Sequence, residues 1–192
     1  MEDPLARVPQ LIIGYKGITG NTPDFYAMQV LNQALASGRS SRLYQQLVKE
    51  KELVTSVFGA MREMRGPGFY VLQASLVPGK KFEDVEAVID QEVAKIQQEP
   101  IADWELEKAK NSSRRGSIQS LQSTLGVAIR LSQFAVFYSD PNLINTQFQK
   151  VAAVTKADVQ RVANKYLKVT NRTVAQTIPK AKASGSQSAM ER

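Results

Sequence analysis

The stretch "GRSSRLYQQLVKEKELVTSVFGA", residues 38–60, predicts a turn, a short helix and then a β-strand that begins near Leu53. The helix is expected over 41–50, and its apolar side chains recur at helical spacing, which predicts one buried face formed by Leu43, Tyr44, Leu47 and Val48. The turn is basic and serine-rich. Neither Ser40 nor Ser41 has a visible base or lysine partner, so we expect Ser40 to cap the helix rather than act as a nucleophile.

The strands around this stretch predict the fold class. Residues 53–63 and 68–78 are β-rich and flank "MRGPG", which predicts an antiparallel hairpin. A further strand is expected over 8–17 and a last one over 172–179. Strands and helices segregate along the chain instead of alternating, so the sequence predicts an α+β fold with a mainly antiparallel sheet.

Helix punctuation is clear between these strands. The helix expected over 21–38 has Thr22 as N-cap, Pro23 at its first position, Asp24 against the helix dipole and Gly38 as C-cap. Three more helices are expected: one with an apolar stripe from Phe82 to Ile96 before Pro100, one beginning at Trp104 with Asp103 as cap, and a strongly apolar one over 123–138. "TKADVQRVANKYL" (155–167) opens with a capping box from Thr155 to Asp158.

Composition excludes several kinds of site. The 192 residues contain no histidine and no cysteine. The usual general base, the commonest zinc ligand and the thiolate chemistries are therefore all missing, and the chain is a poor enzyme candidate by itself. The formal net charge of +7 fits either a polyanion partner or a soluble surface.

Charged clusters are expected to be solvated surface. The pairs Glu50/Glu52 and Glu105/Glu107 are two residues apart, so the members of each pair do not share a helix face. The basic run of Lys108, Lys110, Arg114 and Arg115 lacks interleaved aromatic residues that could stack on bases, so no nucleic-acid partner is expected.

Two segments far apart in sequence carry a family resemblance. "GRSSRLYQQLVKEKELVTSV" resembles the segment that begins the C-terminal half of pitrilysin/insulinase-type zinc metallopeptidases, which include the mitochondrial processing peptidases and their bacterial relatives. "DPNLINTQFQKVAAVTKADVQRVANKYLKVTNRTVAQTIPK" (140–180) resembles the closing pattern of that family, and together the two matches span residues 8–180.

The resemblance implies a half-unit like that of mitochondrial processing peptidase: an α+β domain whose mainly antiparallel sheet is covered by helices on one face. It assigns residues 1–180 to an inactive C-terminal peptidase domain, and 181–192 are expected to be a disordered polar tail. In this family zinc is held by an H-x-x-E-H motif in an N-terminal half. No metal is therefore expected in this chain, and zinc is expected in the N-terminal half of a longer parent.

Many C-terminal halves of the family place an Arg on the helix and a Tyr on the following strand, where they hold the substrate and the oxyanion. Aligned on Leu47 and Val57, these positions are Val48 and Thr55, so both donors are absent here. No catalytic residue is therefore expected in the chain, although the parent is expected to be a zinc metalloendopeptidase.

The resemblance also implies binding partners and a cellular location. The domain should wall a peptide chamber and pack on the zinc-bearing half, and a second homologous subunit could supply the Arg and Tyr. The alternative is a structural or assembly subunit without peptidase activity. No membrane span is visible, and bacterial relatives suggest the periplasm or cell envelope, with a signal peptide upstream.

Overall fold

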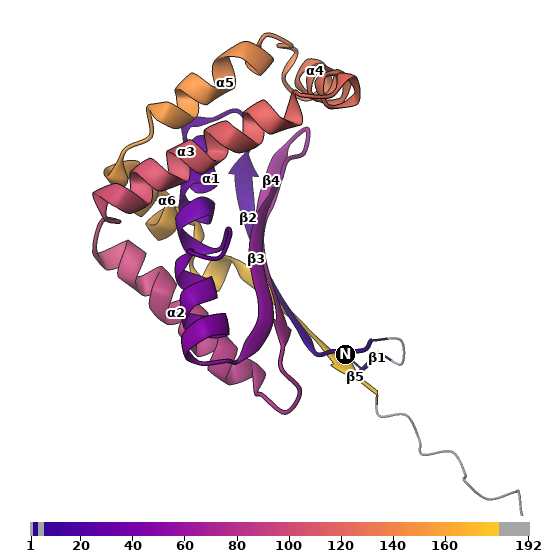
Figure 1. The fold of residues 1–192 in the computed structure, drawn as a ribbon, viewed down its shortest axis with the longest axis vertical. Helices are drawn as coiled ribbons and strands as arrows, with labels where there is room; N and C mark the ends of the chain where they lie inside the picture. Colours follow the sequence, from indigo (N-terminus) through magenta and orange to yellow (C-terminus); the bar gives the residue numbers. More distant parts are fainter. Residues whose placement is uncertain (1, 4–5, 181–192) are drawn as a thin grey trace, which may run out of the picture.

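The protein, described here by a computed structural model over residues 2–3 and 6–180, is a twisted sheet with helices on one side (Figure 1). The predicted α+β class, with a mainly antiparallel sheet covered by helices on one face, is confirmed. The predicted tail over 181–192 lies outside the described residues. The domain boundary at residue 180 stays a prediction.

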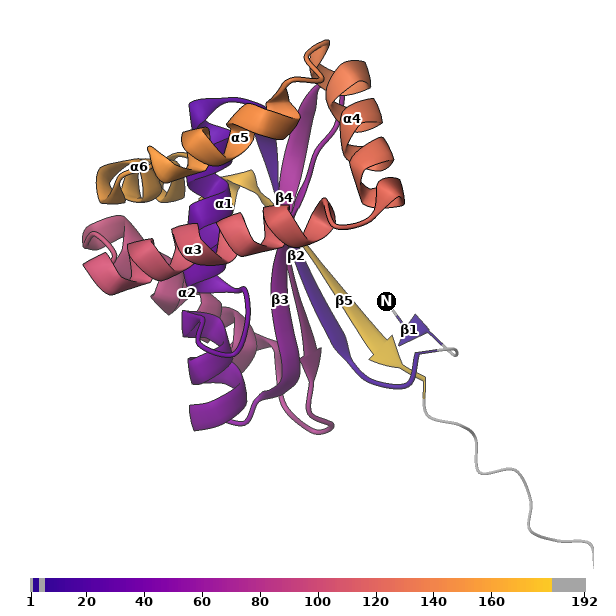
Figure 2. The same ribbon diagram turned by 45° about the horizontal axis from the view of Figure 1, so that its top comes forward.

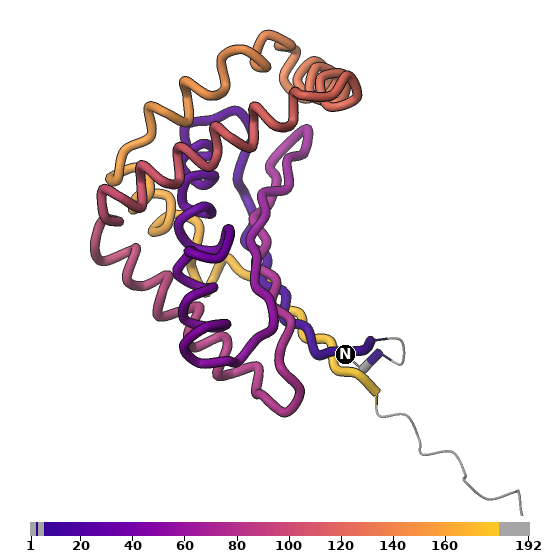
Figure 3. Tube along the Cα trace, viewed as in Figure 1, coloured from indigo at the N-terminus to yellow at the C-terminus, as the bar shows by residue number. Residues whose placement is uncertain are grey.

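Within the described residues the sheet has five strands in the order β1-β5-β2-β4-β3. The hairpin of β3 (Val54–Arg62) and β4 (Pro67–Leu76) is antiparallel, as predicted. β2 (Gln10–Thr19) lies antiparallel between β4 and β5 (Arg172–Pro179), and the short β1 (Glu2–Asp3) runs parallel to β5. The first and last long strands are thus neighbours in the sheet, which Figure 3 shows along the Cα trace.

Six helices follow the predicted order with small shifts at their ends, and α5 and η2 are additional to the prediction. The helices are α1 (Pro23–Leu35), the π-helix η1 (Tyr44–Glu50), α2 (Phe82–Gln98), α3 (Asp103–Ser120), α4 (Thr124–Tyr138), α5 (Leu143–Ala152), α6 (Lys156–Tyr166) and the 3₁₀-helix η2 (Val169–Asn171). No helix in the described part of the chain is both long and apolar enough to cross a membrane. Figure 2 shows α4 standing apart from the other helices.

The helix caps agree with most of the sequence signals. The Thr22 hydroxyl accepts a hydrogen bond from the Phe25 amide at 3.3 Å, and Thr155 and Asp158 form the predicted capping box. Gly38 is not the C-cap of α1, because the helix ends at Leu35 with Ala36 as cap and Gly38 (φ +80°) forms the next turn. Similarly, α3 begins at Asp103 instead of Trp104, with Ala102 in the cap position.

The core lies between the sheet and the helices because side chains alternate along each strand. On β2 and β4 the helix-facing residues are fully buried: Leu11, Ile13, Tyr15, Tyr70, Leu72 and Ala74. The Tyr70 hydroxyl is satisfied there, since it donates to Asn32 Oδ1 at 2.9 Å while the Asn32 amide donates to the Gly59 carbonyl. A Cβ at Gly59 would lie 2.1 Å from Asn32 Oδ1, so this close approach requires glycine.

The opposite side of the sheet carries no helix layer (Figure 1). We call it the open face and define it by two cross-strand rows, Ile12–Gln73–Phe58 and Gly14–Val71–Ala60. These residues are exposed or half-buried, and Phe58 retains 44% of its surface. The sheet is therefore packed on one face and open on the other.

Candidate functional site

The turn at 38–41 is built by its own hydrogen bonds. The Ser41 hydroxyl is fully buried and donates to the Gly38 carbonyl at 2.8 Å. The Ser41 carbonyl then accepts the Gln45 amide at 3.0 Å, which starts the helix. The prediction that Ser40 caps the helix is therefore wrong: no side chain makes a cap hydrogen bond at the start of η1, and the Ser40 carbonyl accepts a hydrogen bond from Lys108.

The helix that follows is wider than the predicted α-helix. Its backbone closes π-type hydrogen bonds, such as Lys51 N–H to the Gln46 carbonyl at 3.0 Å. The predicted buried face is confirmed, because Leu43 and Leu47 are completely buried while Tyr44 and Val48 pack half-buried against the same core. Single π-turns are often found at functional sites.

Val48 and Thr55, the predicted chamber positions, lie on the adjoining elements η1 and β3. The Val48 side chain is half-buried against the core. Thr55 is exposed and lies where the pairing of β3 with β4 shifts register between Val54 and Ser56, and its hydroxyl donates to the Ser75 carbonyl at 3.2 Å. Neither position offers a cationic or phenolic donor, so neither has a group for acid–base chemistry.

A buried ion pair fastens the turn to α3. Arg42 donates through Nε and Nη2 to both oxygens of Glu105, each at 2.7 Å, and Glu105 also accepts the Ala102 amide at 2.9 Å. Burial alone would raise the pKa of Glu105, but the hydrogen bonds from Arg42 and Ala102 outweigh it and lower that pKa. The prediction that Glu105 is solvated surface is wrong, because Arg42 reaches it from 63 residues away; Glu107 is exposed, as predicted.

The other charged residues include possible metal ligands, the pair Glu50/Glu52 and the basic run on α3. Among residues 2–3 and 6–180 no group of three or more His, Cys, Asp or Glu side chains is arranged to hold a metal ion. Glu50 and Glu52 are exposed, as predicted. The basic run on α3 is also divided: Lys108 is tied to the Ser40 carbonyl, and Lys110 and Arg114 share a surface cavity of about 330 Å³ with Glu107.

A surface cavity lies away from the η1–β3 segment. It has about 350 Å³ of space between the starts of α1 and α6 and the end of α5. Lys150 crosses it to donate to Asn21 Oδ1 at 2.8 Å and lies over the ring of Tyr26. Burial, followed by the charges of Glu63 and Asp140, raises the pKa of Tyr26 to about 12, so this phenol is neutral at physiological pH.

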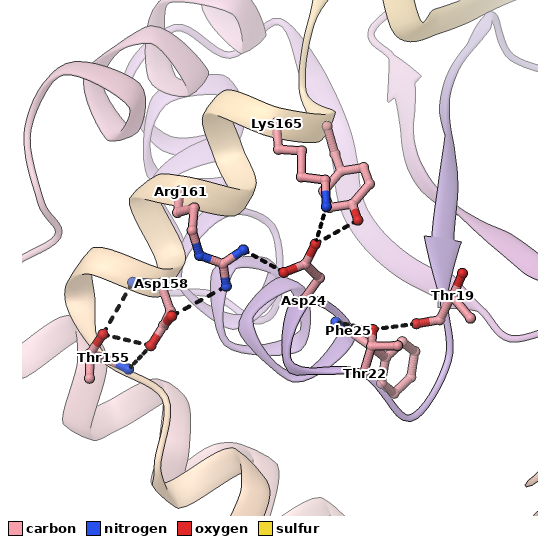
Figure 4. Close-up of polar contacts among 9 residues, drawn as sticks. Thr19, Thr22, Asp24, Phe25, Thr155, Asp158, Arg161 and Lys165 are labelled. Atoms are coloured by element: carbon pink, nitrogen blue, oxygen red, sulfur yellow. Dashed lines mark hydrogen bonds and ion pairs between the residues drawn. The ribbon is translucent and has the colours of Figure 1, made fainter.

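A second polar cluster joins the first and last helices (Figure 4). Asp24, in the first turn of α1, accepts hydrogen bonds from Arg161, from Lys165 at 2.7 Å and from the Tyr166 hydroxyl at 2.7 Å. Partial burial would raise the pKa of Asp24, yet these three donors lower it well below its ordinary value. The cluster bridges α1 and α6, so it is a structural tie.

No local pattern in the sequence predicts these long-range ties. Arg42 and Glu105 are 63 residues apart, Asp24 and Arg161 are 137 apart, and each residue by itself is typical of a solvated face. By contrast, the positions of Val48 and Thr55 on adjoining elements follow from the predicted helix and strand. Their predicted role remains a prediction.

Comparison with known proteins identifies the family to which this sequence is similar. The family model described as the peptidase M16 inactive domain matches residues 1–113, more than half of the chain. An uncharacterized zinc protease of Mycobacterium leprae is 31% identical over 142 residues, which are 74% of this chain and 32% of that protein. The chain therefore spans about a third of the length of the curated relatives it matches.

Solved structures repeat the fold. A protease from Helicobacter pylori superposes with a TM-score of 0.84 at 25% identity, covering 93% of this chain and 43% of that one. The inactive peptidase domain of a candidate zinc protease from Bordetella parapertussis gives a TM-score of 0.82 at 28% identity, covering 92% of this chain and 94% of that one. The periplasmic protease PqqL of Escherichia coli shares the fold alone, with a TM-score of 0.70 at 16% identity over 94% of this chain and 20% of that one.

Proposed function

This chain belongs to the peptidase M16 inactive-domain family, and we propose that it is the C-terminal, non-catalytic half of a longer zinc metallopeptidase. In that role it walls the chamber that holds a peptide and packs against the half that carries zinc. The proposal concerns the whole protein, since this chain spans about a third of its curated relatives.

The observation that carries this proposal is the open face of the sheet. Elsewhere in the fold the helices cover the apolar side chains of β2 and β4, but no helix covers the row Ile12–Gln73–Phe58, in which Phe58 is exposed and the other two are half-buried. A sheet surface that mixes apolar and amide side chains can contact an extended peptide without strong sequence preference. On the adjoining η1–β3 segment Thr55 is exposed, whereas Val48 packs half-buried against the core.

Zinc does not fit this chain. Tetrahedral zinc sites in proteins use histidine and cysteine above all, and the 192 residues contain neither. Carboxylates do not substitute, because the described residues contain no cluster of three or more such groups. In the proposed protein the metal and its base therefore belong to the N-terminal half, while this chain contributes shape and contact surface.

We propose that a second homologous subunit supplies the Arg and Tyr that Val48 and Thr55 do not provide. One preorganised oxyanion donor is typically worth about 10²–10³ in rate. The unpartnered parent should then hydrolyse peptides slowly, and the partner should restore activity by that factor.

The test is a gain of function in cis. In the full-length protein, Val48→Arg with Thr55→Tyr should raise kcat/KM on a fluorogenic peptide by about 10-fold or more without the partner. The matched control is Lys49→Arg with Ser56→Tyr, which places the same groups one residue away. Equal rates in the two double variants, or full activity of the unpartnered wild type, would count against the assigned positions.

A structural or assembly subunit is the second candidate, because both donor positions are occupied by residues without a strong donor. It predicts that the full-length protein stays inert even with its partner. The absence of an H-x-x-E-H motif from the parent sequence would favour this candidate directly.

For location we propose the bacterial periplasm or cell envelope. The support is the periplasmic relative that shares this fold at low identity. Fractionation of cells that express the full-length protein, with marker enzymes for cytoplasm and periplasm, tests this proposal.

A further inference from the structure

Helix α4 exposes an apolar face that nothing in the described chain covers. Leu125, Ile129 and Val136 retain 70%, 56% and 59% of their surface, although α4 is the most apolar helix of the fold. A helix that is apolar all round is normally buried. Exposure of such side chains on one helix is therefore a sign of a missing neighbour.

The other side of α4 is firmly held. Phe134 is buried, and Tyr138 and Gln133 both donate to Glu63 beside the β3–β4 hairpin, at 2.8 and 3.2 Å. Tyr138 also fills the space beside Gly20, where a Cβ would lie 1.9 Å from the phenol oxygen. α4 is thus anchored by one face, so the opposite face has a fixed position from which to bind.

The spacing of the exposed residues fits a helix as the binding partner. Leu125, Ile129, Ser132 and Val136 follow one another at intervals of four, three and four residues, which is the seam of a left-handed helix pair. Ala128 and Ala135 flank the seam and are also exposed. Small flanking residues let a second helix approach closely. We call this set of six residues the α4 seam.

The area of the α4 seam indicates what kind of partner can bind it. A helix of this length is about 22 Å long and about 10 Å across, so two copies meeting at the seam would bury on the order of 500 Å². Stable dimers need about 1,200 Å² or more. A covalently linked partner works at an effective concentration in the millimolar range, so a small face is sufficient for it.

The charges around the seam argue against a lipid surface. Helices that lie on membranes carry Lys and Arg beside the apolar face. The one charged residue of α4 is Arg130, which is half-buried and lies over the ring of Phe134 on the anchored side. The seam itself contains no charge to attract anionic headgroups.

We propose that the α4 seam docks a helix of the zinc-bearing half of the same polypeptide. This inference rests on the proposed function, because it uses the two thirds of the relatives' length that this chain does not span. Docking there would fix one end of the sheet against the other half and so set the width of the chamber at the open face.

The test is amide hydrogen exchange over residues 124–138, measured in the isolated 192-residue chain and in the full-length protein. The close Bordetella structure consists almost entirely of this domain, so the isolated domain folds by itself in a relative. Exchange in α4 should be at least 10-fold slower in the full-length protein. Ile129→Glu with Val136→Glu should return it to the rate of the isolated chain, and the milder Ile129→Ser should do so in part.

The control variant is Val169→Glu, because Val169 is 68% exposed on η2 and lies outside the seam. It should leave the slow exchange of α4 unchanged. Equal exchange in isolated and full-length protein would overturn the proposal. So would protection in the isolated chain that grows with its concentration, or that appears on adding phosphatidylcholine–phosphatidylglycerol vesicles.

Peptidase assays on the same samples separate this inference from the proposed function. If α4 is protected in a full-length protein that does not cleave peptides, the docking stands and the peptidase role fails. If peptides are cleaved while α4 exchanges freely, the peptidase role stands and the docking fails.

Discussion

The α1–α6 pair buries its apolar residues, whereas α4 exposes many of its own. α1 buries Leu31 and Leu35 completely, and α6 buries Val159 and Val162 beside it. Their polar rims are joined through Asp24, Arg161 and Lys165 (Figure 4). α4 is more apolar than either helix but leaves Leu125, Ile129 and Val136 more than half exposed. One carboxylate, Glu63, accepts both of its side-chain hydrogen bonds to the hairpin.

This difference shows that the apolar composition of a helix predicts its burial. It does not tell whether the covering surface lies within these 192 residues or in another part of the polypeptide. For α1 and α6 the covering partner is within the 192 residues, so their ties are complete. For α4 we propose that it lies in another part of the polypeptide. If so, changes in the first region should cost stability in the isolated chain, whereas changes in the α4 seam should cost little there.

The largest loss of stability should come from a substitution in the buried face of η1. Leu47→Ala removes a completely buried side chain of η1 and should lower the free energy of unfolding by about 2–5 kcal/mol, since a cavity is left behind. Urea denaturation of the isolated chain measures this change. Ile129→Ala on the α4 seam is the matched control and should cost less than about 1 kcal/mol. Similar losses at both positions would refute the comparison.

Next in size should be the Arg42–Glu105 pair. Arg42→Ala leaves a buried carboxylate without its main partner and should cost about 2–4 kcal/mol. Arg115→Ala on the exposed side of α3 is the control, with an expected change within about 0.5 kcal/mol. The double variant Arg42→Ala with Glu105→Ala should cost less than the sum of the two single changes. Strict additivity would show that the pair is not coupled.

The tie between α1 and α6 should be smaller and dependent on pH. Asp24→Asn should cost about 1–2 kcal/mol at pH 7, because charge-assisted hydrogen bonds are lost. The folded-state pKa of Asp24 is lowered, so its contribution is complete above the unfolded value near pH 4 and is lost as the pH falls towards the folded value. The gap between wild type and variant should therefore narrow from about pH 4 downward.

Asp84→Asn is the control for that experiment. Asp84 also lies in the first turn of a helix, α2, but it is exposed and makes no ion pair among the described residues. Its variant reports the helix-dipole effect alone, about 0.3–1 kcal/mol. A pH dependence as large as that of Asp24→Asn would assign the effect to the dipole instead of to α6.

The smallest effect should be at the anchor of α4. Tyr138→Phe removes the hydrogen bond to Glu63 and should cost about 0.5–1.5 kcal/mol, measured by thermal unfolding of the isolated chain. It should also speed amide exchange within α4. Tyr44→Phe is the control, because no hydrogen bond of the Tyr44 hydroxyl is seen among the described residues. Equal exchange of α4 in the two variants would mean that Glu63 does not anchor the helix.

The sequence predicted the elements of the fold well because they rest on local signals. The cap of α1 at Thr22, the capping box at Thr155 and the hairpin after η1 all depend on neighbours within a few residues. The misplaced ends were local too: Gly38 and Ser40 are suitable cap residues, but α1 ends with Ala36 as its cap and η1 has no side-chain cap. Such shifts follow from tertiary packing, which decides the last turn of a helix.

The candidate site could be predicted only as positions. Val48 and Thr55 were found by aligning a motif, and the structure adds that one side chain packs on the core while the other bonds to the Ser75 carbonyl. The fate of Glu105 could not be predicted. Its neighbours in sequence are exposed, and the guanidinium that buries it comes from the turn before η1.

The amino-acid sequence by itself determined the α+β class, the order of the elements and the lack of zinc ligands, because periodicity, caps and residue types are local properties. Only the tertiary structure decided that Glu105 is buried, that Asp24 ties α1 to α6 and that the apolar face of α4 stays in solvent. Burial and ion pairing depend on which distant surfaces meet, and no short window of sequence contains both surfaces.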